Sequence, residues 1–488
     1  MCKLAGIPIP TIREMDELLD DKTFDIYKEG LTSTINQADS EFATGLVKTY
    51  CPRSVSEMSA FVAIIRPGCA SLLQDFVHRK SYTTGVEELD EQLVEGNHRM
   101  LYQELIMKYL IWLGIPETGS YDIIKKIAKK KFKEAELEEL KAKLQCGWLE
   151  RVGKENGFEE TWKVVEQAAK YSFNASHSLS YAYDSLYGAY LKSHYPLEYY
   201  TVALNYYVND SERTLSLTNE LKYFGISLRP IQFRYSQSAY SLVREDNSIY
   251  KGIKSIQYMN QQVAEELYEL RGNQYSSFIQ LLKDIKGKTS VDARQLKTLI
   301  ELDFFAEFGD ANFLLAQYKL FDKYNGRSQF YKKDLPTLGI PEELLVKHSG
   351  KVTEKTFTKV NSYGLIKDLI STLQIPPRTL SEKIKSQNEH LGYIDIADPK
   401  YAGMAAVLSV DTKYAPKVKL HSLKNGTTVD CKIDRRTFNK TKLQPDDIIR
   451  IISTDDRPKS QKDEDGNWVK IPGTKELWIT NYQIIKGI

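Results

Sequence analysis

The stretch that decides the fold runs from Tyr171 to Tyr200 and reads YSFNASHSLSYAYDSLYGAYLKSHYPLEYY. It opens with a polar cluster, and aromatic and apolar residues then recur every three or four positions, as one buried face of a helix requires. Pro196 cannot continue the helix, and Lys192 and His194 suit the negative end of its dipole. We therefore predict a helix at the centre of a domain, with these buried residues: Tyr183, Leu186, Tyr187, Tyr190 and Leu191.

Length and composition bound the class of protein. At 488 residues the chain is long enough for about three or four domains. Its 42% hydrophobic and 27% charged residues are typical of a soluble globular protein. No apolar run approaches the ~20 residues of a membrane span, so no membrane partner is expected. The five cysteines are scattered, which predicts neither a zinc site nor a disulfide framework and favours a reducing cytoplasm.

Two motifs carry a resemblance to a known family. The box Phe173-Asn174-Ala175-Ser176-His177 and the helix end from Leu191 to Pro196 keep their order and spacing. Both are similar to the fingers of the alpha subunit of bacterial DNA polymerase III, the C-family replicative polymerase, with Ala175 in place of the lysine of the box. The resemblance covers roughly residues 5–310. It implies a DNA-directed DNA polymerase, a nucleotidyltransferase that works in DNA replication.

The resemblance also implies a multidomain α+β fold, mostly helical and followed by an all-β domain. We expect fingers over residues 1–209, a tandem helix-hairpin-helix region over 210–310, a mixed linker over 311–388 and an OB-like β domain over 389–488. The Asn425-Gly426 and Asp465-Gly466 pairs are hairpin signals in that last part. Tyr258-Met259-Asn260 stands where the family has glycine-valine-glycine, so we expect the hairpin to keep its shape and to contact phosphate more weakly.

Six lysines within residues 125–133 form the main candidate for nucleotide binding. On a helix, Lys125, Lys129 and Lys133 fall on one stripe, and Lys126 and Lys130 on the next. From the residues alone, a solvated lysine face is the favoured explanation. The resemblance assigns them to the triphosphate of the incoming deoxynucleotide.

The polar box belongs to the same predicted site. The resemblance gives His177 a role in positioning phosphate or template, with hydrogen-bonding support from Asn174 and Ser176. A hydrolytic triad needs a serine and a histidine from separate segments, so the neighbouring Ser176 and His177 do not predict a hydrolase.

Candidate DNA contacts are spread along the chain. Residues 413–442 hold nine lysines or arginines against two aspartates and include Tyr414 and Phe438, a pattern typical of a single-strand groove, although a solvated barrel face fits nearly as well. Lys192 fits a dipole cap equally. The predicted DNA-binding residues are Arg66, Gly68, Lys192, Lys254, Lys419, Arg435 and Arg436.

Nucleotide addition needs two metal ions held by carboxylates. In the family those carboxylates precede the fingers, where the resemblance here begins. We expect no catalytic or metal site in this chain: Asp395 to Asp398, Asp446-Asp447 and Asp463 to Asp465 fit turns and loops. Mg²⁺ is expected on a palm carried by a separate polymerase chain.

The expected partners are a DNA primer-template, a deoxynucleoside triphosphate, that palm-bearing chain, and a sliding clamp through Gln329-Phe330-Tyr331. The departures from the family motifs point to a fast-evolving source such as a bacteriophage. The alternative is a non-catalytic DNA-binding replication accessory protein.

Overall fold

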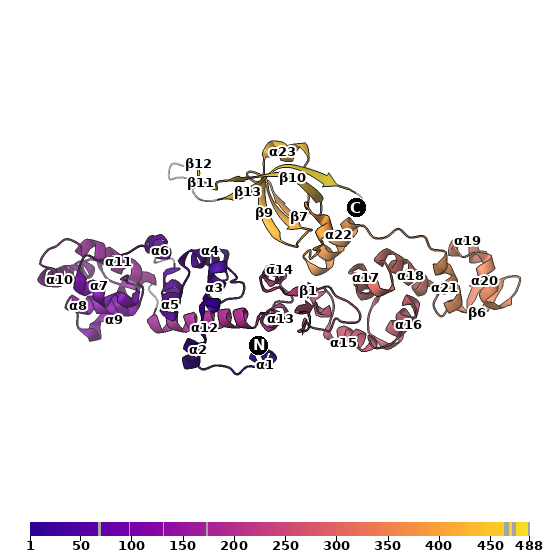
Figure 1. Ribbon diagram of the computed structural model, residues 1–488, viewed down its shortest axis with the longest axis horizontal. Coiled ribbons are helices and arrows are strands. Elements are labelled where there is room, and N and C mark those ends of the chain that lie inside the picture. Colours follow the sequence, from indigo (N-terminus) through magenta and orange to yellow (C-terminus); the bar gives the residue numbers. More distant parts are fainter. Residues whose placement is uncertain are drawn as a thin grey trace. The chain divides into compact units, whose positions relative to one another are not determined.

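The computed structural model describes residues 1–66, 70–96, 98–129, 131–171, 174–462, 468–470 and 475–486. Gly68, Lys130 and Phe173, together with the acidic segment 463–465, lie outside the described residues. The chain divides into two compact units, Met1–Ala203 and Leu204–Ile488 (Figure 1). Among the described helices, none combines the length and the apolar character that crossing a membrane would take.

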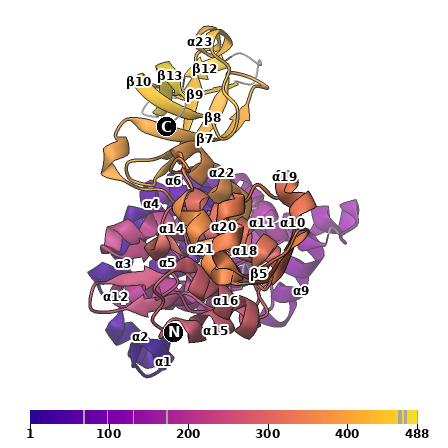
Figure 2. The ribbon, with the colours of Figure 1, turned by 90° about the vertical axis from the view of Figure 1, so that its right-hand side faces the viewer.

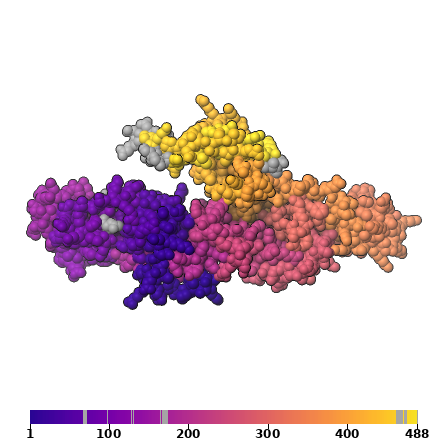
Figure 3. Space-filling view, in the orientation of Figure 1, coloured from indigo at the N-terminus to yellow at the C-terminus, as the bar shows by residue number. Residues whose placement is uncertain are grey.

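The first unit is helical. Side chains fill the spaces between its ribbons (Figure 3). Its helices are α1 (Cys2–Ala5), α2 (Ile12–Leu18), α3 (Asp21–Glu29), α4 (Glu41–Tyr50), α5 (Val55–Ile64), α6 (Ala70–Val77), α7 (Glu87–Gln92), α8 (Gln103–Trp112), α9 (Glu117–Ala128), α10 (Glu134–Val152), α11 (Phe158–Tyr171) and α12 (Ala175–His194), and α13 (Pro196–Tyr206) runs on from it.

The predicted central helix is α12, which packs against α3 and α5. Leu186, Tyr190 and Leu191 are buried as expected, whereas Tyr183 and Tyr187 are only half-buried. The close packing comes from small residues that the apolar pattern did not single out: Ser178, Ala182, Ser185 and Ala189 are all buried. Small side chains let neighbouring helices approach, and buried hydroxyls bond across the contact, as Ser185 Oγ does to Tyr27 Oη at 2.9 Å.

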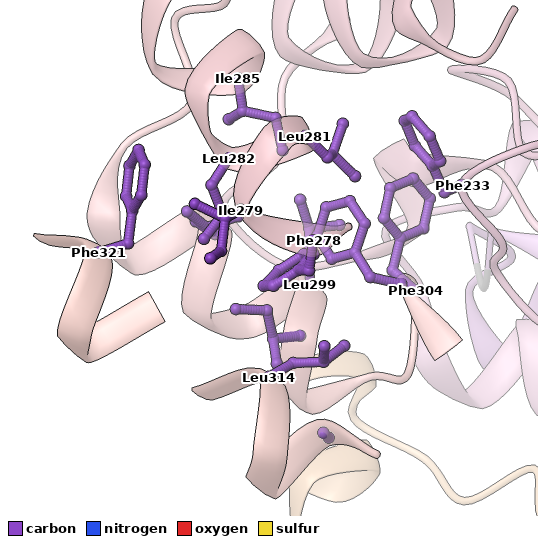
Figure 4. Close-up of a cluster of buried hydrophobic side chains, with 14 of the residues drawn as sticks. Phe233, Phe278, Ile279, Leu281, Leu282, Ile285, Leu299, Phe304, Leu314 and Phe321 are labelled. Atoms are coloured by element: carbon purple, nitrogen blue, oxygen red, sulfur yellow. The ribbon is translucent and has the colours of Figure 1, made fainter. Parts of the chain in front are cut away.

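The second unit starts with α14 (Ser211–Glu220), a 3-10 helix (Leu221–Phe224) and a small sheet of β1 (Ser227–Arg229), β2 (Ser241–Val243) and β3 (Ser248–Tyr250). A second 3-10 turn, Ile253–Ser255, leads into α15 (Gln261–Leu270), α16 (Phe278–Lys288), α17 (Ala293–Glu301) and α18 (Ala311–Tyr324). Phe233, Phe278, Leu299 and Phe304 belong to the apolar core that these helices enclose (Figure 4). The two turns of the predicted helix-hairpin-helix region, called the first and second hairpin here, precede α15 and α17. Both are therefore supported by the same apolar core.

A three-stranded sheet follows, ordered β4 (Gln329–Tyr331), β6 (Thr356–Val360) and β5 (Ser349–Val352), with α19 (Leu335–Leu338), α20 (Glu342–His348) and α21 (Ser362–Ser371). The segment expected to bind a sliding clamp is β4. Phe330 is fully buried and pairs with Phe357 on β6. An aromatic side chain held in a core cannot insert into a partner, so the structure does not support that expectation.

After α22 (Leu380–Leu391), the chain closes a five-stranded barrel in the order β10-β13-β9-β8-β7 (Figure 2). The strands are β7 (Met404–Asp411), β8 (Lys417–Ser422), β9 (Thr428–Ile433), β10 (Ile448–Arg457) and β13 (Glu476–Ile485), with the β11–β12 hairpin (Ser460–Lys462, Trp468–Lys470) between the last two. Helix α23 (Arg435–Lys440) connects β9 to β10, and β9 pairs in parallel with β13. This is the predicted OB-like fold, with Asn425-Gly426 in the turn between β8 and β9.

Candidate functional site

The lysine cluster lies at the carboxyl end of α9. Lys125 and Lys126 occupy its last turn and are exposed. The Lys125 ammonium lies 4.1 Å from the centre of the Tyr121 ring, and that of Lys126 lies 5.5 Å from the Phe132 ring. Both ammonium groups therefore make cation–π contacts at the surface, where they are accessible to an anion.

The continuous lysine stripe is not formed. Helix α9 ends at Ala128, Lys129 follows it as an exposed cap, and Lys133 already precedes α10. The repeat of three and four assumed an unbroken helix, but the chain turns between these residues. Of the predicted set, α9 itself holds Lys125 and Lys126.

The polar box forms the amino end of α12. The Asn174 side-chain oxygen accepts from the His177 amide at 3.1 Å and from the Ser176 hydroxyl, which makes Asn174 the cap of the helix. Its amide donates to Glu104 Oε1 at 2.7 Å, and the Ala175 amide donates to Glu104 Oε2 at 3.0 Å. Glu104 thus fixes the start of α12 to the start of α8, a role that the sequence did not indicate.

His177 is exposed on the first turn of α12. Its ring meets the Tyr181 ring edge-on at 4.5 Å between centroids. The Asn174 oxygen accepts both of these hydrogen bonds within the box, so Asn174 and Ser176 orient this helix end, and the His177 ring lies at the surface.

Lys192 is not at the surface, which contradicts its prediction as a DNA contact. The residue is 0% exposed, and its ammonium donates to the carbonyls of Leu31 at 2.7 Å and Ser33 at 2.8 Å. The rings of Tyr199 and Tyr200 flank the charge. A buried lysine that satisfies two carbonyls holds the segment after α3 against α12, and its charge does not reach a phosphate.

Two other predicted DNA contacts lie outside the barrel. Arg66 is half-buried after α5, and its guanidinium donates to Gln37 Oε1 at 3.4 Å. Lys254 lies exposed in the 3-10 turn that precedes the first hairpin of the second unit.

The barrel carries a groove of about 740 Å³. The loop between β7 and β8 forms one side, and Tyr414 on that loop is 67% exposed. Arg435 lies in the groove and donates to the Tyr414 carbonyl at 2.6 Å. The lining residues are Asp411, Lys413, Tyr414, Ala415, Lys417, Lys432, Arg435, Ser460, Glu476 and Trp478.

Part of this charge is already paired. Lys432 forms an ion pair with Glu476 at 2.8 Å, and Trp478 donates to the same carboxylate at 3.1 Å. The Arg457 guanidinium lies 4.4 Å from the Trp478 ring and is held by Asp434. The pKa of Arg457 is raised by its hydrogen bonds to Asp434 and Asp455. The charges at this end of the groove are thus paired, whereas the Lys413 and Tyr414 end is exposed.

The predicted basic stripe is only partly in the groove. Arg435 lines it, while Lys419 on β8 and Arg436 on α23 are absent from its lining. Phe438 is buried in the barrel core, which contradicts its expected role as a stacking surface. Trp478 was missed because it meets Lys432 only when β13 pairs with β9.

The described carboxylates named above have local partners. Asp395 pairs with the buried Lys251, and Asp398 caps a 3-10 turn and pairs with Lys400 at 2.7 Å. Asp446 accepts from Asn388, and Asp447 accepts from the Gln444 amide. Within the described ranges, histidine, cysteine and acidic side chains nowhere gather in a group of three that could hold a metal ion. These described carboxylates do not converge into a two-metal site.

Comparison with known proteins agrees with this geometry. The family model of the bacterial DNA polymerase III alpha subunit finger domain matches residues 9–151, and that of a helix-hairpin-helix motif matches residues 225–312. The first match includes Arg66, Lys125 and Lys126, and the second includes both hairpins of the second unit.

Curated relatives support the same assignment. The chain is 30% identical over 295 residues to the DNA polymerase III subunit alpha of Aquifex aeolicus, covering 59% of this chain and 25% of the relative. It is 28% identical over 334 residues to the subunit of Campylobacter jejuni (66% and 27%) and 26% over 308 residues to that of Thermus aquaticus (61% and 25%). The chain therefore spans about a quarter of the length of these relatives. Over its finger-domain and helix-hairpin-helix matches, the chain is similar to the alpha subunits of bacterial DNA polymerase III.

Proposed function

We propose that the chain is the C-terminal portion of a replicative DNA polymerase of the polymerase III alpha type. It supplies contacts to the incoming nucleotide and to DNA, and a palm on another polypeptide supplies the carboxylates. The observation that carries the proposal is the finger-domain match, which contains the exposed Lys125 and Lys126 at the end of α9.

In this proposal the two lysines neutralise the triphosphate. An ammonium is a point charge on a flexible stem, so it attracts phosphate without fixing its orientation as an arginine fork does. The α12 box adds the exposed His177, oriented by the Asn174 cap. Mg²⁺ on the palm would supply the charge stabilisation that in-line displacement needs.

The barrel groove serves the DNA in the same proposal. OB folds bind oligonucleotides on the face and loops where this groove lies. Tyr414 offers a stacking surface, and Lys413, Lys417 and Arg435 offer charge along it. Aromatic rings and cations in one groove favour single-stranded DNA, which stacks its bases and presents its phosphates together.

Primer extension tests the polymerase role. The purified chain is assayed alone and with extract from its source depleted of host polymerase. We expect extension only with the extract, and in the Lys125→Ala/Lys126→Ala variant a rise of at least about 100-fold in the KM for deoxynucleotide, because each of the two charged contacts contributes about 1.5–3 kcal/mol. Lys143→Ala/Lys163→Ala is the matched control, since it removes two exposed lysines from α10 and α11 of the same unit.

The outcomes separate the two functions. Equal effects of the two variants would overturn the assignment of Lys125 and Lys126. Extension by the chain alone would overturn the assignment of the metal site to another polypeptide. Salt-sensitive DNA binding without extension under either condition would leave the alternative, a non-catalytic DNA-binding accessory protein.

A further inference from the structure

The first hairpin of the second unit holds Tyr258 in an unusual conformation. Its φ is +66°, in the left-handed region that glycine adopts readily and a tyrosine rarely does. The residue is nevertheless 60% exposed. A large side chain in a glycine-type position, directed to solvent, gains nothing from core packing, so its contacts at the surface are where a role is to be sought.

Contacts to the second hairpin hold this position. The Gln295 side chain donates to the Tyr258 carbonyl at 3.0 Å, and Gln295 is itself 8% exposed and part of the capping box of α17 with Asp292. On the other side, Asn260 caps α15 by accepting from the Val263 amide at 2.9 Å. Two helix starts therefore fix the backbone beneath the ring.

The second hairpin also places a cation on the ring. The Arg294 guanidinium lies 3.6 Å from the ring centre of Tyr258, which is stacking distance. Within the described ranges no carboxylate lies within ion-pair distance of Arg294, and its side chain is exposed. Since the guanidinium covers one face of the ring, the exposed area of Tyr258 belongs to the opposite face and the edge.

We propose that Tyr258 and Arg294 form a binding site for single-stranded DNA, in which an unpaired base stacks on the open face of Tyr258 and the neighbouring phosphate pairs with Arg294. The proposal rests on the proposed function, which supplies DNA as the ligand. It adds a second binding site on the chain and specifies that the DNA bound there is single-stranded. A paired base hides its faces in the duplex, so only an unpaired one reaches the ring. The exposed guanidinium keeps donors for a phosphate while it stacks.

A second tyrosine–arginine pair provides the matched control. The Arg271 guanidinium also lies 3.6 Å from a tyrosine ring, that of Tyr268 at the other end of α15. Tyr268 is half-buried, and Arg271 donates to its carbonyl at 2.8 Å. The separation and the charge are the same, but the ring offers less surface, so this pair should bind no base.

The experiment uses the full chain with Tyr414→Ala in every sample, so that the barrel groove contributes less. Fluorescence anisotropy measures binding of an oligothymidylate and of a blunt duplex of the same length. We expect Tyr258→Gly to weaken single-strand binding by about 5- to 100-fold, the range for loss of one stacked base. The melting temperature should not fall, because glycine relieves the positive φ. Tyr258→Phe should bind normally, and Arg294→Gln should weaken binding where Arg271→Gln does not.

Photocrosslinking locates the contact independently of affinity. An oligothymidylate that contains 5-iododeoxyuridine should crosslink to Tyr258 in the chain without any substitution, including Tyr414→Ala. Crosslinks confined to the barrel, or equal effects of Arg294→Gln and Arg271→Gln, would overturn this site and leave the proposed function standing. Loss of duplex and single-strand binding in equal measure would also overturn it. Absence of any salt-sensitive DNA binding would overturn both.

Discussion

The last turns of α9 and α12 look alike in sequence and differ in structure. Each last turn contains lysine, and the lysines of each were predicted to bind a ligand. Lys125 and Lys126 on α9 are exposed, whereas Lys192 on α12 is fully buried between two backbone carbonyls. A basic last turn therefore indicates that cations are present, but the surrounding tertiary structure determines whether a ligand can reach them.

Truncating Lys192 should give the largest effect. Lys192→Ala removes the partner of the Leu31 and Ser33 carbonyls and leaves a cavity beside Tyr200, so we expect the first unit to lose about 3–5 kcal/mol of stability. Urea unfolding followed by circular dichroism measures this. Lys125→Ala is the control and should change stability by at most about 0.5 kcal/mol. An unchanged midpoint for Lys192→Ala with weaker DNA binding would restore Lys192 as a DNA contact.

The surroundings of α12 also predict a pH response. Helix α12 packs on α5, where the hydrogen bonds from Arg79 lower the pKa of Glu57. A carboxyl with a lowered folded-state pKa stabilises the protein above its unfolded value, near 4.5, and this contribution is lost as pH falls further. We expect Glu57→Gln to cost about 1 kcal/mol at pH 7 and progressively less as the pH falls below 4.5. Thermal unfolding across this range measures it.

Glu91→Gln is the matched control, since it removes an exposed carboxylate of α7. It should shift the melting temperature little at either pH. A cost for Glu57→Gln that does not decrease as the pH falls from 7 to 3 would show that its side chain stabilises α5 by packing and not through the ion pair with Arg79.

The sequence predicted the elements whose signals are local. The buried residues Leu186 and Leu191, the end of α12 before Pro196 and the Asn425-Gly426 turn all follow from spacing within a few residues. The resemblance correctly indicated the finger domain, the helix-hairpin-helix segment and the OB-like barrel.

What the sequence could not predict depends on contacts between distant segments. Lys192 is buried by carbonyls about 160 positions earlier in the chain. Phe330 and Phe438 lie in cores that form only when sheets close. Trp478 reaches Lys432 through the pairing of β13 with β9. In each case the residue type was visible, and its partner was set by the tertiary fold.

The barrel shows the same contrast between a lysine that is paired within the protein and one that is exposed to a ligand. The change in DNA binding expected here is the smallest of those predicted. Lys432 is paired with Glu476, whereas Lys413 is exposed beside Tyr414 in the same groove. We expect Lys413→Ala to weaken single-strand binding a few-fold and to reduce the slope of log affinity against log salt by about 0.7, the value for one phosphate contact. Lys432→Ala should leave that slope nearly unchanged and lower the melting temperature of the barrel, because Glu476 would lose its ion-pair partner. Equal changes in slope for both variants would mean that the ion pair with Glu476 opens when DNA binds, and that a lysine paired in the free protein is still available to a ligand.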